Sequence, residues 1–444
     1  MIEMSPPLIA ILMLAGLIIG ILTGFPLALP IGFVALAVGW LVFGPAVIEV
    51  IYQQIWGMYY NYILLALPLF VLMGVALEYS GIADKMFEAL FLLLGGFKGG
   101  LALVTMVIGV VIAACVGVMS ASVTLVCSLC LAPMIKRGYD KRIATGAVGG
   151  AGTLGILIPP SVMLVVYGPM ARLSVGKLFM AAVFPGLLLA ILYAGFIIVK
   201  CQLEPELAPT VPAEERRAPI GYKLKLLFIS LVPPAFIIFS VLGVIFLGIA
   251  PPTEASAVGA LASFVMVIAY RKMTWHNLKS ILLRTLNITA MAYFIAVMSV
   301  GYTGVFLRSG AGEVVQNAVL ATPGGRWGVF FAVMFIYFIL GFFVEWIGIF
   351  FIMVPLLAPL APKLGFDPIW FGIMIAVNLQ MSFLTPPYAF TMFIIRAAAP
   401  KELGIESMDI IRGVIPYVIM IIVGLMLCVA FPEIILWLPR VMIQ

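Results

Sequence analysis

Two adjacent prolines interrupt an apolar run that is long enough to cross a membrane. The run extends over 143–170, and residues 155–161 near its middle read Gly-Ile-Leu-Ile-Pro-Pro-Ser. Neither proline can donate a backbone N–H, so a helix here loses the hydrogen bonds to the carbonyls of Gly155 and Ile156. Unpaired carbonyls are costly in hydrocarbon and are tolerated where they line a cavity or hold a cation. We therefore predict a broken helix whose carbonyls face such a site.

A second copy of this interruption lies 227 positions later, where residues 382–388 read Ser-Phe-Leu-Thr-Pro-Pro-Tyr. The hydrogen bonds lost there are those to the carbonyls of Ser382 and Phe383. Proline is common in membrane helices, so one copy alone could be an ordinary kink. Two copies at one offset instead indicate a duplicated broken helix, an arrangement that transporters use at their binding sites.

Composition indicates an all-α polytopic membrane protein in a lipid bilayer. Of the 444 residues, 65% are hydrophobic and 9% are charged, and long apolar runs recur throughout. The net charge of +6 requires no nucleic-acid partner, and the lone His276 cannot form a metal site by itself. Cys127 and Cys130 fit helix packing better than a redox pair. Because the sequence shows no Ser-His-Asp set, Walker loop or metal-ligand cluster, neither an enzyme nor an ATP-driven pump is indicated, and no cofactor is expected.

Further matches at nearly the same offset indicate an internal duplication. Pro26 and Pro252 open similar apolar segments, and Pro133 matches Pro359. We predict a first repeat at 1–205, a linker at 206–220 and a second repeat at 221–444. Each repeat is expected to hold two spans, an amphipathic arm, a third span, a short surface helix, two long features and a last span. The paired long features are 100–135 with 141–171, and 326–361 with 368–396.

Charge placement decides which long feature of each pair crosses the membrane. If 100–135 and 326–361 are re-entrant hairpins and the Pro-Pro segments cross, 18 Lys and Arg residues lie on one side and 6 on the other. If instead the Pro-Pro segments are the hairpins and 100–135 and 326–361 cross, the two sides hold 9 and 15 Lys and Arg residues. The positive-inside rule favours the first assignment, which places the linker in the cytoplasm and both termini outside. Five spans is an odd number, so the second repeat is inverted relative to the first.

Each hairpin tip is expected to meet the Pro-Pro break of its own repeat near the bilayer midplane. The first tip falls near 115–124, a segment rich in small and hydroxyl residues. Ser120, Ser122 and Thr124 are candidates to contact a substrate or a cation, and ordinary helix packing is the alternative for any one of them. Ser161 and Asn378 complete the polar candidates for substrate contact.

The second tip falls near 341–348 and contains Glu345. A carboxylate at membrane depth is costly and usually functional, so Glu345 is a further candidate substrate contact, a wet pocket rim being the alternative. Thr385 precedes the second Pro-Pro pair. Its hydroxyl and carbonyl can both face the cavity, or the hydroxyl can bond back to a carbonyl one turn earlier. Carbonyls and hydroxyls suit Na⁺, and half-helix N-termini suit a carboxylate.

Together these motifs resemble the large membrane subunit of TRAP transporters, the DctM-like permeases, over essentially the whole chain. The motifs are 155–161, 384–388, Ala-Pro-Pro-Thr-Glu-Ala-Ser-Ala-Val-Gly-Ala at 250–260 and Leu-Ala-Pro-Met-Ile-Lys-Arg-Gly-Tyr-Asp-Lys at 131–141. The resemblance implies an elevator-type, Na⁺-coupled importer of the ion-transporter superfamily, with organic acids such as C4-dicarboxylates or related carboxylates as substrates. It implies two partners, a small four-helix membrane subunit and a periplasmic substrate-binding protein, in a bacterial or archaeal cytoplasmic (inner) membrane.

The alternatives are a stand-alone Na⁺/anion symporter of the same superfamily and a membrane protein in which the breaks are only kinks.

The resemblance also implies two Na⁺ sites. The first would use backbone oxygens of Gly155, Ile158 and Pro160 with the tip near Val116. The second would use Gly341, Ser382, Thr385 and Tyr388. Ser382 stands where the family frequently has Gly, and Tyr388 where it frequently has Met, so the bulk of Tyr388 bears on pocket shape.

We expect the segments 84–171 and 312–396 to slide together against a frame that consists of the first two spans and the arms.

Overall fold

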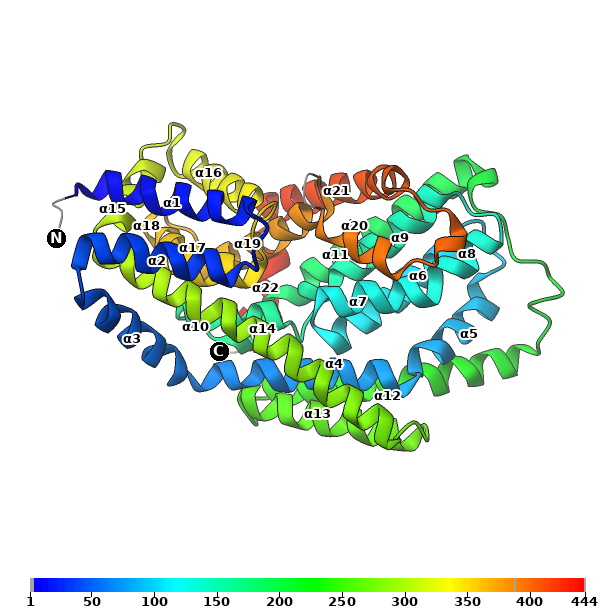
Figure 1. The fold of residues 1–444 in the computed structure, drawn as a ribbon. Helices are drawn as coiled ribbons and strands as arrows, with labels where there is room; N and C mark the ends of the chain where they lie inside the picture. Colours follow the sequence, from blue (N-terminus) through cyan, green and yellow to red (C-terminus); the bar gives the residue numbers. More distant parts are fainter. Residues whose placement is uncertain (1–3, 387–388, 443–444) are drawn as a thin grey trace.

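The computed structural model describes residues 4–386 and 389–442, and their regular structure consists of helices without strands (Figure 1). This confirms the predicted all-α class. By length and composition, eight of the described helical segments can cross a membrane. The helices of the first half are α1 (Pro6–Leu22), α2 (Ala28–Phe43), α3 (Ala46–Tyr59), α4 (Ala66–Ser80), α5 (Ile82–Leu94), α6 (Gly100–Val116), α7 (Met119–Val126), α8 (Ala132–Lys136), α9 (Lys141–Thr153), α10 (Val162–Ala171) and α11 (Val175–Leu203).

The second half follows a similar order. Its helices are α12 (Ile220–Phe246), α13 (Pro252–Ala269), α14 (Trp275–Arg308), α15 (Ala311–Leu320), α16 (Gly325–Leu340), α17 (Trp346–Leu357), α18 (Leu360–Lys363), α19 (Pro368–Leu384), α20 (Phe390–Ala398), α21 (Ser407–Ala430) and α22 (Glu433–Met442). The inversion of one half relative to the other across a membrane stays a prediction.

Side-chain caps fix where several of these helices begin. The Asp140 carboxylate accepts a hydrogen bond from Arg142 N at 2.8 Å at the start of α9. Its counterpart Asp367 accepts from Ile369 N at 2.8 Å at the start of α19. Thr274 Oγ1 accepts from Asn277 N at 3.1 Å before α14. Each cap satisfies an N–H group that the first turn of a helix leaves unpaired.

The arm and the third span differ between the halves. In the first half they are the separate helices α3 and α4, whereas in the second half they form the single 34-residue helix α14. The first half carries Asn61, whose side chain accepts from Ile63 N at 3.3 Å, and Pro68 at this junction. Helix α14 contains no proline, so nothing in its backbone prevents the arm from continuing into the span.

The first two predicted spans form short helices. Helices α1 and α2 have 17 and 16 residues, below the roughly 20 that a straight helix needs to cross the hydrocarbon core. The intervening segment Gly24-Phe25-Pro26 causes this, because Gly24 has a positive φ of 79° and Pro26 cannot donate to the preceding turn. The two helices form an antiparallel pair at the left of Figure 1, and their turn points to the middle of the molecule.

The helices form two groups with an extensive interface. One group, the frame, consists of α1–α4 and α12–α14, in which α4 packs against α13 and α14 packs against α2 and α3. The other, the core bundle, consists of α6–α11 and α16–α22. Here α9 packs against α6 and α21, and α19 packs against α16, α11 and α21. The last helices α11 and α21 therefore lie with the segments expected to move, although they are outside the predicted limits 84–171 and 312–396.

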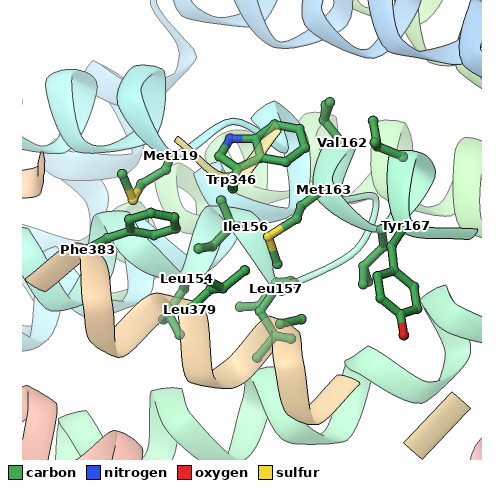
Figure 2. Packing of buried hydrophobic residues seen from close by; sticks show 14 of the residues in the cluster. Met119, Leu154, Ile156, Leu157, Val162, Met163, Tyr167, Trp346, Leu379 and Phe383 are labelled. Carbon is green, nitrogen blue, oxygen red and sulfur yellow. The ribbon is translucent and has the colours of Figure 1, made fainter. Parts of the chain in front are cut away.

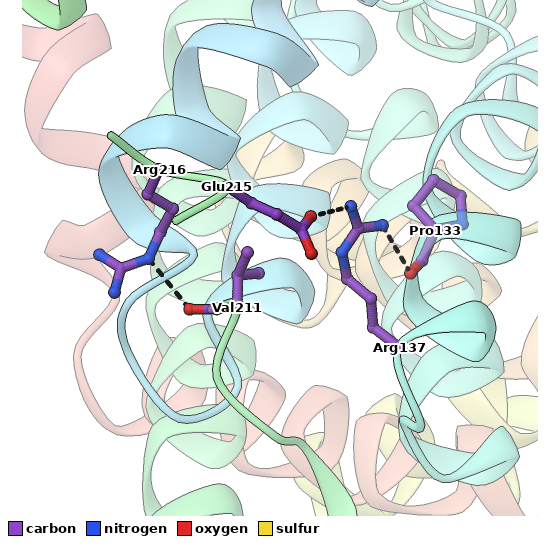
Figure 3. A network of polar contacts seen from close by, with 5 residues as sticks. All are labelled: Pro133, Arg137, Val211, Glu215 and Arg216. Carbon is purple, nitrogen blue, oxygen red and sulfur yellow. Dashed lines mark hydrogen bonds and ion pairs between the residues drawn. The ribbon is translucent and has the colours of Figure 1, made fainter. Parts of the chain in front are cut away.

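The linker between the halves lies across the open end of the first hairpin (Figure 3). The Arg137 guanidinium donates to the Glu215 carboxylate at 2.7 Å. Arg216 Nε donates to the carbonyl of Val211 at 3.1 Å, and Val211 N donates to the carbonyl of Gly95 at 2.8 Å. The linker is thus an ordered strap that connects the core bundle to the start of α12.

Candidate functional site

The first hairpin turns at Gly117 and Val118, inside the predicted segment 115–124. Helix α6 ends at Val116 and α7 begins at Met119. Gly117 has a φ of 64°, a conformation that glycine adopts without steric cost. A Cβ atom at this position would also lie 2.6 Å from the carbonyl oxygen of Pro160, so the turn requires glycine for a second reason. The tip therefore sits directly against the first Pro-Pro break.

The first break separates α9 from α10, and Ser161 bridges it. Its hydroxyl donates to the carbonyl of Ile156 at 2.5 Å and accepts from Leu164 N at 3.4 Å. The carbonyl of Ile156 is therefore not free, contrary to the expectation from the missing proline N–H. Ser161, expected as a substrate contact, is fully buried and caps α10 instead. The peptide bond between Pro159 and Pro160 is cis.

The tip and the break are joined by a backbone hydrogen bond and a close approach. Val162 N donates to the carbonyl of Gly117 at 3.2 Å. A Cβ atom on Gly155 would lie 2.6 Å from Ser122 Oγ. The Ser122 hydroxyl is buried and has no hydrogen-bond partner among the described residues. Buried polar atoms are nearly always paired, so an unpaired hydroxyl against a glycine backbone is a candidate ligand position for a cation.

The second hairpin forms a similar contact between a glycine and a buried serine hydroxyl, but the hairpin and the broken helix supply the opposite partners. Helix α16 ends at Leu340, and α17 begins at Trp346, so the turn lies within the predicted segment 341–348. A Cβ atom on Gly341 would lie 2.7 Å from Ser382 Oγ. The Ser382 hydroxyl is likewise buried and unpaired in the described part of the chain. Here the hairpin supplies the glycine and the broken helix supplies the hydroxyl.

The Thr385 hydroxyl bonds back to a carbonyl one turn earlier, which is the second of the two arrangements expected for it. It donates to the carbonyl of Met381 at 2.7 Å. The Thr385 backbone N–H lies 3.1 Å from that carbonyl and 3.2 Å from the carbonyl of Ser382. The carbonyl of Ser382 is therefore less free than the proline pattern suggested. Tyr388, expected at the same Na⁺ site, lies outside the described residues.

Neither contact contains the side chains of a transition-metal site. No group of three or more His, Cys, Asp or Glu side chains gathers anywhere in 4–386 or 389–442. A cation bound at these positions would rest on carbonyl and hydroxyl oxygens, which suit Na⁺. Two further expected backbone ligands, Val116 at the end of α6 and Ile158 before the first Pro-Pro pair, pack against other helices. The carbonyl oxygen of Val116 is 2.8 Å from where a Cβ on Gly74 of α4 would lie, and Ile158 packs against Gly186 of α11.

The two tips enclose a cavity of about 410 Å³ with the turn between α1 and α2. Its polar lining includes Ser120 and Glu345, both expected as substrate contacts. The first residues of α7 and α17 also line it, so two helix N-termini lie at its wall. The full described lining is Ile21, Gly24, Phe25, Pro26, Leu27, Val118, Met119, Ser120, Gly341, Phe343, Val344, Glu345, Trp346, Phe383 and Phe390.

Hydrophobic packing joins the two halves (Figure 2). Met119 and Ile156 of the first half and Trp346 and Phe383 of the second half belong to one buried cluster. Tyr167 of α10 makes an edge contact with Phe350 of α17, with ring centroids 5.4 Å apart. The candidate sites of both halves therefore belong to one packed unit.

Several expected substrate residues lie outside the cavity. The Thr124 hydroxyl donates to the carbonyl of Ser120 at 2.7 Å, one turn earlier. The Asn378 amide donates to the carbonyl of Met334 at 2.7 Å and lines a separate apolar groove against α16 and α21. Ser122 and Ser161 face the break. Of the polar residues expected to contact substrate, Ser120 and Glu345 are the two that line the cavity.

Sequence reasoning missed the aromatic character of the cavity and the part that the frame takes in it. Phe25 lies in the turn between α1 and α2, and Phe343, Trp346, Phe383 and Phe390 flank the tip and the second break. Aromatic residues are frequent in this sequence, so they carry no signal by themselves. The Gly-Phe-Pro interruption of the first apolar run was the available hint that a turn occurs there.

Comparison with known proteins agrees with this architecture. Residues 14–434 match the family described as the tripartite ATP-independent periplasmic transporter, DctM component. The C4-dicarboxylate TRAP transporter large permease protein DctM of Pseudomonas aeruginosa is 32% identical over 381 residues, covering 86% of this chain and 87% of that protein. The sialic acid TRAP transporter large permease protein SiaM of Vibrio cholerae is 30% identical over 421 residues, covering 94% and 95%.

The fold is also similar to that of a solved transporter. The crystal structure of the Alcanivorax borkumensis YdaH transporter aligns with a TM-score of 0.57 over 96% of this chain and 99% of that one, at 14% identity. At this identity the likeness concerns the fold alone. The match to the family over residues 14–434 is independent of it and extends across both hairpins and both breaks. This chain therefore belongs to the DctM component family of tripartite ATP-independent periplasmic transporters, and it is a transporter permease rather than an enzyme.

Proposed function

We propose that this chain is the membrane permease of a Na⁺-coupled, binding-protein-dependent importer of organic acids such as C4-dicarboxylates or related carboxylates. The observation that carries the proposal is the cavity between the two hairpin tips, adjacent to two glycine–hydroxyl contacts. A substrate in this cavity would touch both tips, so its binding and that of a cation beneath it would depend on the same local geometry.

The helix N-termini at the cavity wall support an acidic substrate. Helices α7 and α17 begin at Met119 and Trp346, which both line the cavity. The first N–H groups of a helix lack intrahelical partners and carry positive partial charge, which favours a carboxylate. Ser120 adds a hydroxyl at the same wall. The relatives named for C4-dicarboxylates and for sialic acid are both named for acids.

The unpaired hydroxyls support Na⁺ coupling. Ser122 and Ser382 each hold a buried oxygen against the backbone of a glycine, and neither oxygen has a partner among the described residues. Na⁺ at these positions would draw the tip and the break of each half together. The two tips form the cavity, so Na⁺ at the breaks would favour the arrangement that binds substrate.

Transport is proposed to occur by sliding of the core bundle against the frame. The interface is crossed by few polar contacts in the described residues, among them the Thr303 hydroxyl, which donates to the carbonyl of Phe351 at 2.8 Å. Helices α5 and α15 connect the two groups, because α5 packs against both α12 and α6 and α15 packs against both α1 and α17. Such short connectors can act as hinges between two rigid bodies.

The partners follow from the family's tripartite organisation. We propose a small four-helix membrane subunit bound to the frame and a periplasmic binding protein that delivers the substrate, in a bacterial or archaeal inner membrane. Purified chain reconstituted in vesicles with both partners is expected to accumulate substrate, and uptake should fall to background when either partner is omitted. Undiminished uptake by the chain alone would instead establish the stand-alone Na⁺/anion symporter.

Orientation gives a separate prediction. We expect the linker in the cytoplasm and both termini outside, because this places 18 Lys and Arg residues inside and 6 outside. Thr210 is an exposed linker residue and a suitable reporter. In intact cells, Thr210→Cys should react with a thiol reagent only after the membrane is permeabilised. Reaction with a membrane-impermeant reagent in intact cells would reverse the whole topology.

A further inference from the structure

The cavity between the tips contains a carboxyl side chain and no basic side chain. Glu345 is the one acidic residue among the described lining residues, which include no Lys, Arg or His. A site built for a dianion would normally place a cation opposite the ligand, since two negative charges in a poorly solvated cavity repel each other. The lining therefore favours a ligand that carries a cationic group, which a carboxylate attracts.

The Glu345 carboxylate is available to such a ligand. Among the described residues it has no ion pair and no side-chain hydrogen bond, and it does not cap α17 although it occupies the N-cap position. Four other carboxylates among the described residues form ion pairs, as Glu78 does with Arg284 at 2.6 Å and Glu215 with Arg137 at 2.7 Å. Glu345 thus differs from them in facing a cavity without a protein partner.

Aromatic rings line the same cavity as the carboxylate. Phe343 and Trp346 are its near neighbours in the sequence, and Phe25, Phe383 and Phe390 line the same cavity. Aromatic faces attract cations, and rings grouped around a cavity are a common means of recognising ammonium groups that have no hydrogen-bond donors. A carboxylate together with several aromatic rings is therefore suited to a cationic group.

We propose that the cavity accepts a zwitterion, namely a carboxylate that also carries an ammonium or amidinium group. The cationic group would lie between Glu345 and the aromatic rings, and the carboxylate would lie away from Glu345, at the N-terminus of α7. This inference rests on the proposed function, because it assumes that the cavity is the carboxylate site. It narrows the substrates from organic acids in general to those that carry both charges, and it disfavours C4-dicarboxylates.

Two probes of the same shape isolate the cationic charge. Glycine betaine and 3,3-dimethylbutyrate differ in one atom, a positively charged nitrogen in place of a neutral carbon, and both carry one carboxylate. Succinate serves as the dicarboxylate. Occupancy is read from Ile21→Cys at the cavity wall, by the rate at which a maleimide alkylates it in purified full-length protein in Na⁺ buffer. The five native cysteines are buried, so protein without this substitution gives the background.

Glycine betaine is expected to protect Ile21→Cys at a concentration at least about tenfold lower than either anion does. Adding Glu345→Gln should remove that preference and leave protection by 3,3-dimethylbutyrate in place, which also shows that the cavity is still formed. Glu313→Gln, on the exposed face of α15, is the matched control and should leave the preference unchanged.

The possible results separate this inference from the proposed function. Equal protection by betaine and 3,3-dimethylbutyrate, or best protection by succinate, would overturn the zwitterion while keeping the cavity as a carboxylate site. A betaine preference that survives Glu345→Gln would overturn the role of Glu345. Protection by none of the three probes would overturn the cavity as the substrate site, and the zwitterion with it. If Glu345→Gln does not fold, the ratio between betaine and 3,3-dimethylbutyrate in the Ile21→Cys protein still decides the substrate class.

Discussion

Joining Ile295 of the frame to Gly348 of the core bundle should abolish transport and leave Na⁺ binding intact. A Cβ atom on Gly348 would lie 3.6 Å from Cγ2 of Ile295, so the two positions are in contact, and an oxidant is expected to join Ile295→Cys to Gly348→Cys. Both positions are buried at the contact between α14 and α17. If the core bundle slides against the frame, the bond fixes the cavity on one side of the membrane. Reduction of the same sample should restore uptake, which separates the crosslink from the two substitutions.

A crosslink within the frame provides the control. A Cβ atom on Gly32 of α2 would lie 3.7 Å from Cβ of Met298 in α14, within the usual range for a disulfide. Oxidised Gly32→Cys with Met298→Cys should transport normally, because both helices belong to the frame. Full uptake after complete oxidation of the 295–348 pair would show that the site is fixed and that only local gates move.

Replacing either unpaired hydroxyl should weaken Na⁺ binding by roughly tenfold to a hundredfold. Ser122→Ala and Ser382→Ala each remove one oxygen that would contribute about 1–3 kcal/mol as a ligand. Folding should be nearly unaffected, since neither hydroxyl has a partner in the described residues. The measurement is the Na⁺ concentration for half-maximal uptake. Ser263→Ala removes an equally buried, unpaired hydroxyl in α13 of the frame and should change nothing.

Thr385→Val refines this test. The Thr385 hydroxyl donates its proton to the carbonyl of Met381, so its oxygen is a poorer candidate ligand than that of Ser382. We expect a smaller change in Na⁺ dependence for Thr385→Val than for Ser382→Ala. Thr303→Val is unsuitable as a control, because the Thr303 hydroxyl bonds to the carbonyl of Phe351 across the interface between frame and core bundle.

An unchanged Na⁺ concentration for half-maximal uptake in Ser122→Ala and Ser382→Ala would show that neither hydroxyl is a Na⁺ ligand.

The sequence predicted the features that proline, glycine and charge dictate locally. Gly117 and the turn before Trp346 lie inside the segments expected for the tips, because small residues and chain direction leave few places for a turn within an apolar run. The breaks at the Pro-Pro pairs follow from missing N–H groups. The sequence also distinguished Glu345, since an acidic residue in an apolar run is rare enough to notice.

What the sequence did not show depends on contacts between distant segments. Nothing local indicates that the Ser161 hydroxyl satisfies the carbonyl of Ile156, or that Asn378 turns to the carbonyl of Met334. The roles of these hydroxyls and amides are decided by which backbone group lies nearest in the packed structure. Similarly, the turn containing Phe25 reaches the cavity because α1 and α2 are short, and helix ends are the least certain part of a pattern-based prediction.

Uptake into vesicles under a controlled Na⁺ gradient tests the central claim most directly. The vesicles contain this chain with its small subunit, and the loaded binding protein is supplied outside. An inward Na⁺ gradient should drive accumulation, and replacing Na⁺ by K⁺ on both sides should reduce uptake to background. Equal uptake with K⁺ in place of Na⁺, or uptake that requires ATP as its only energy source, would contradict the account.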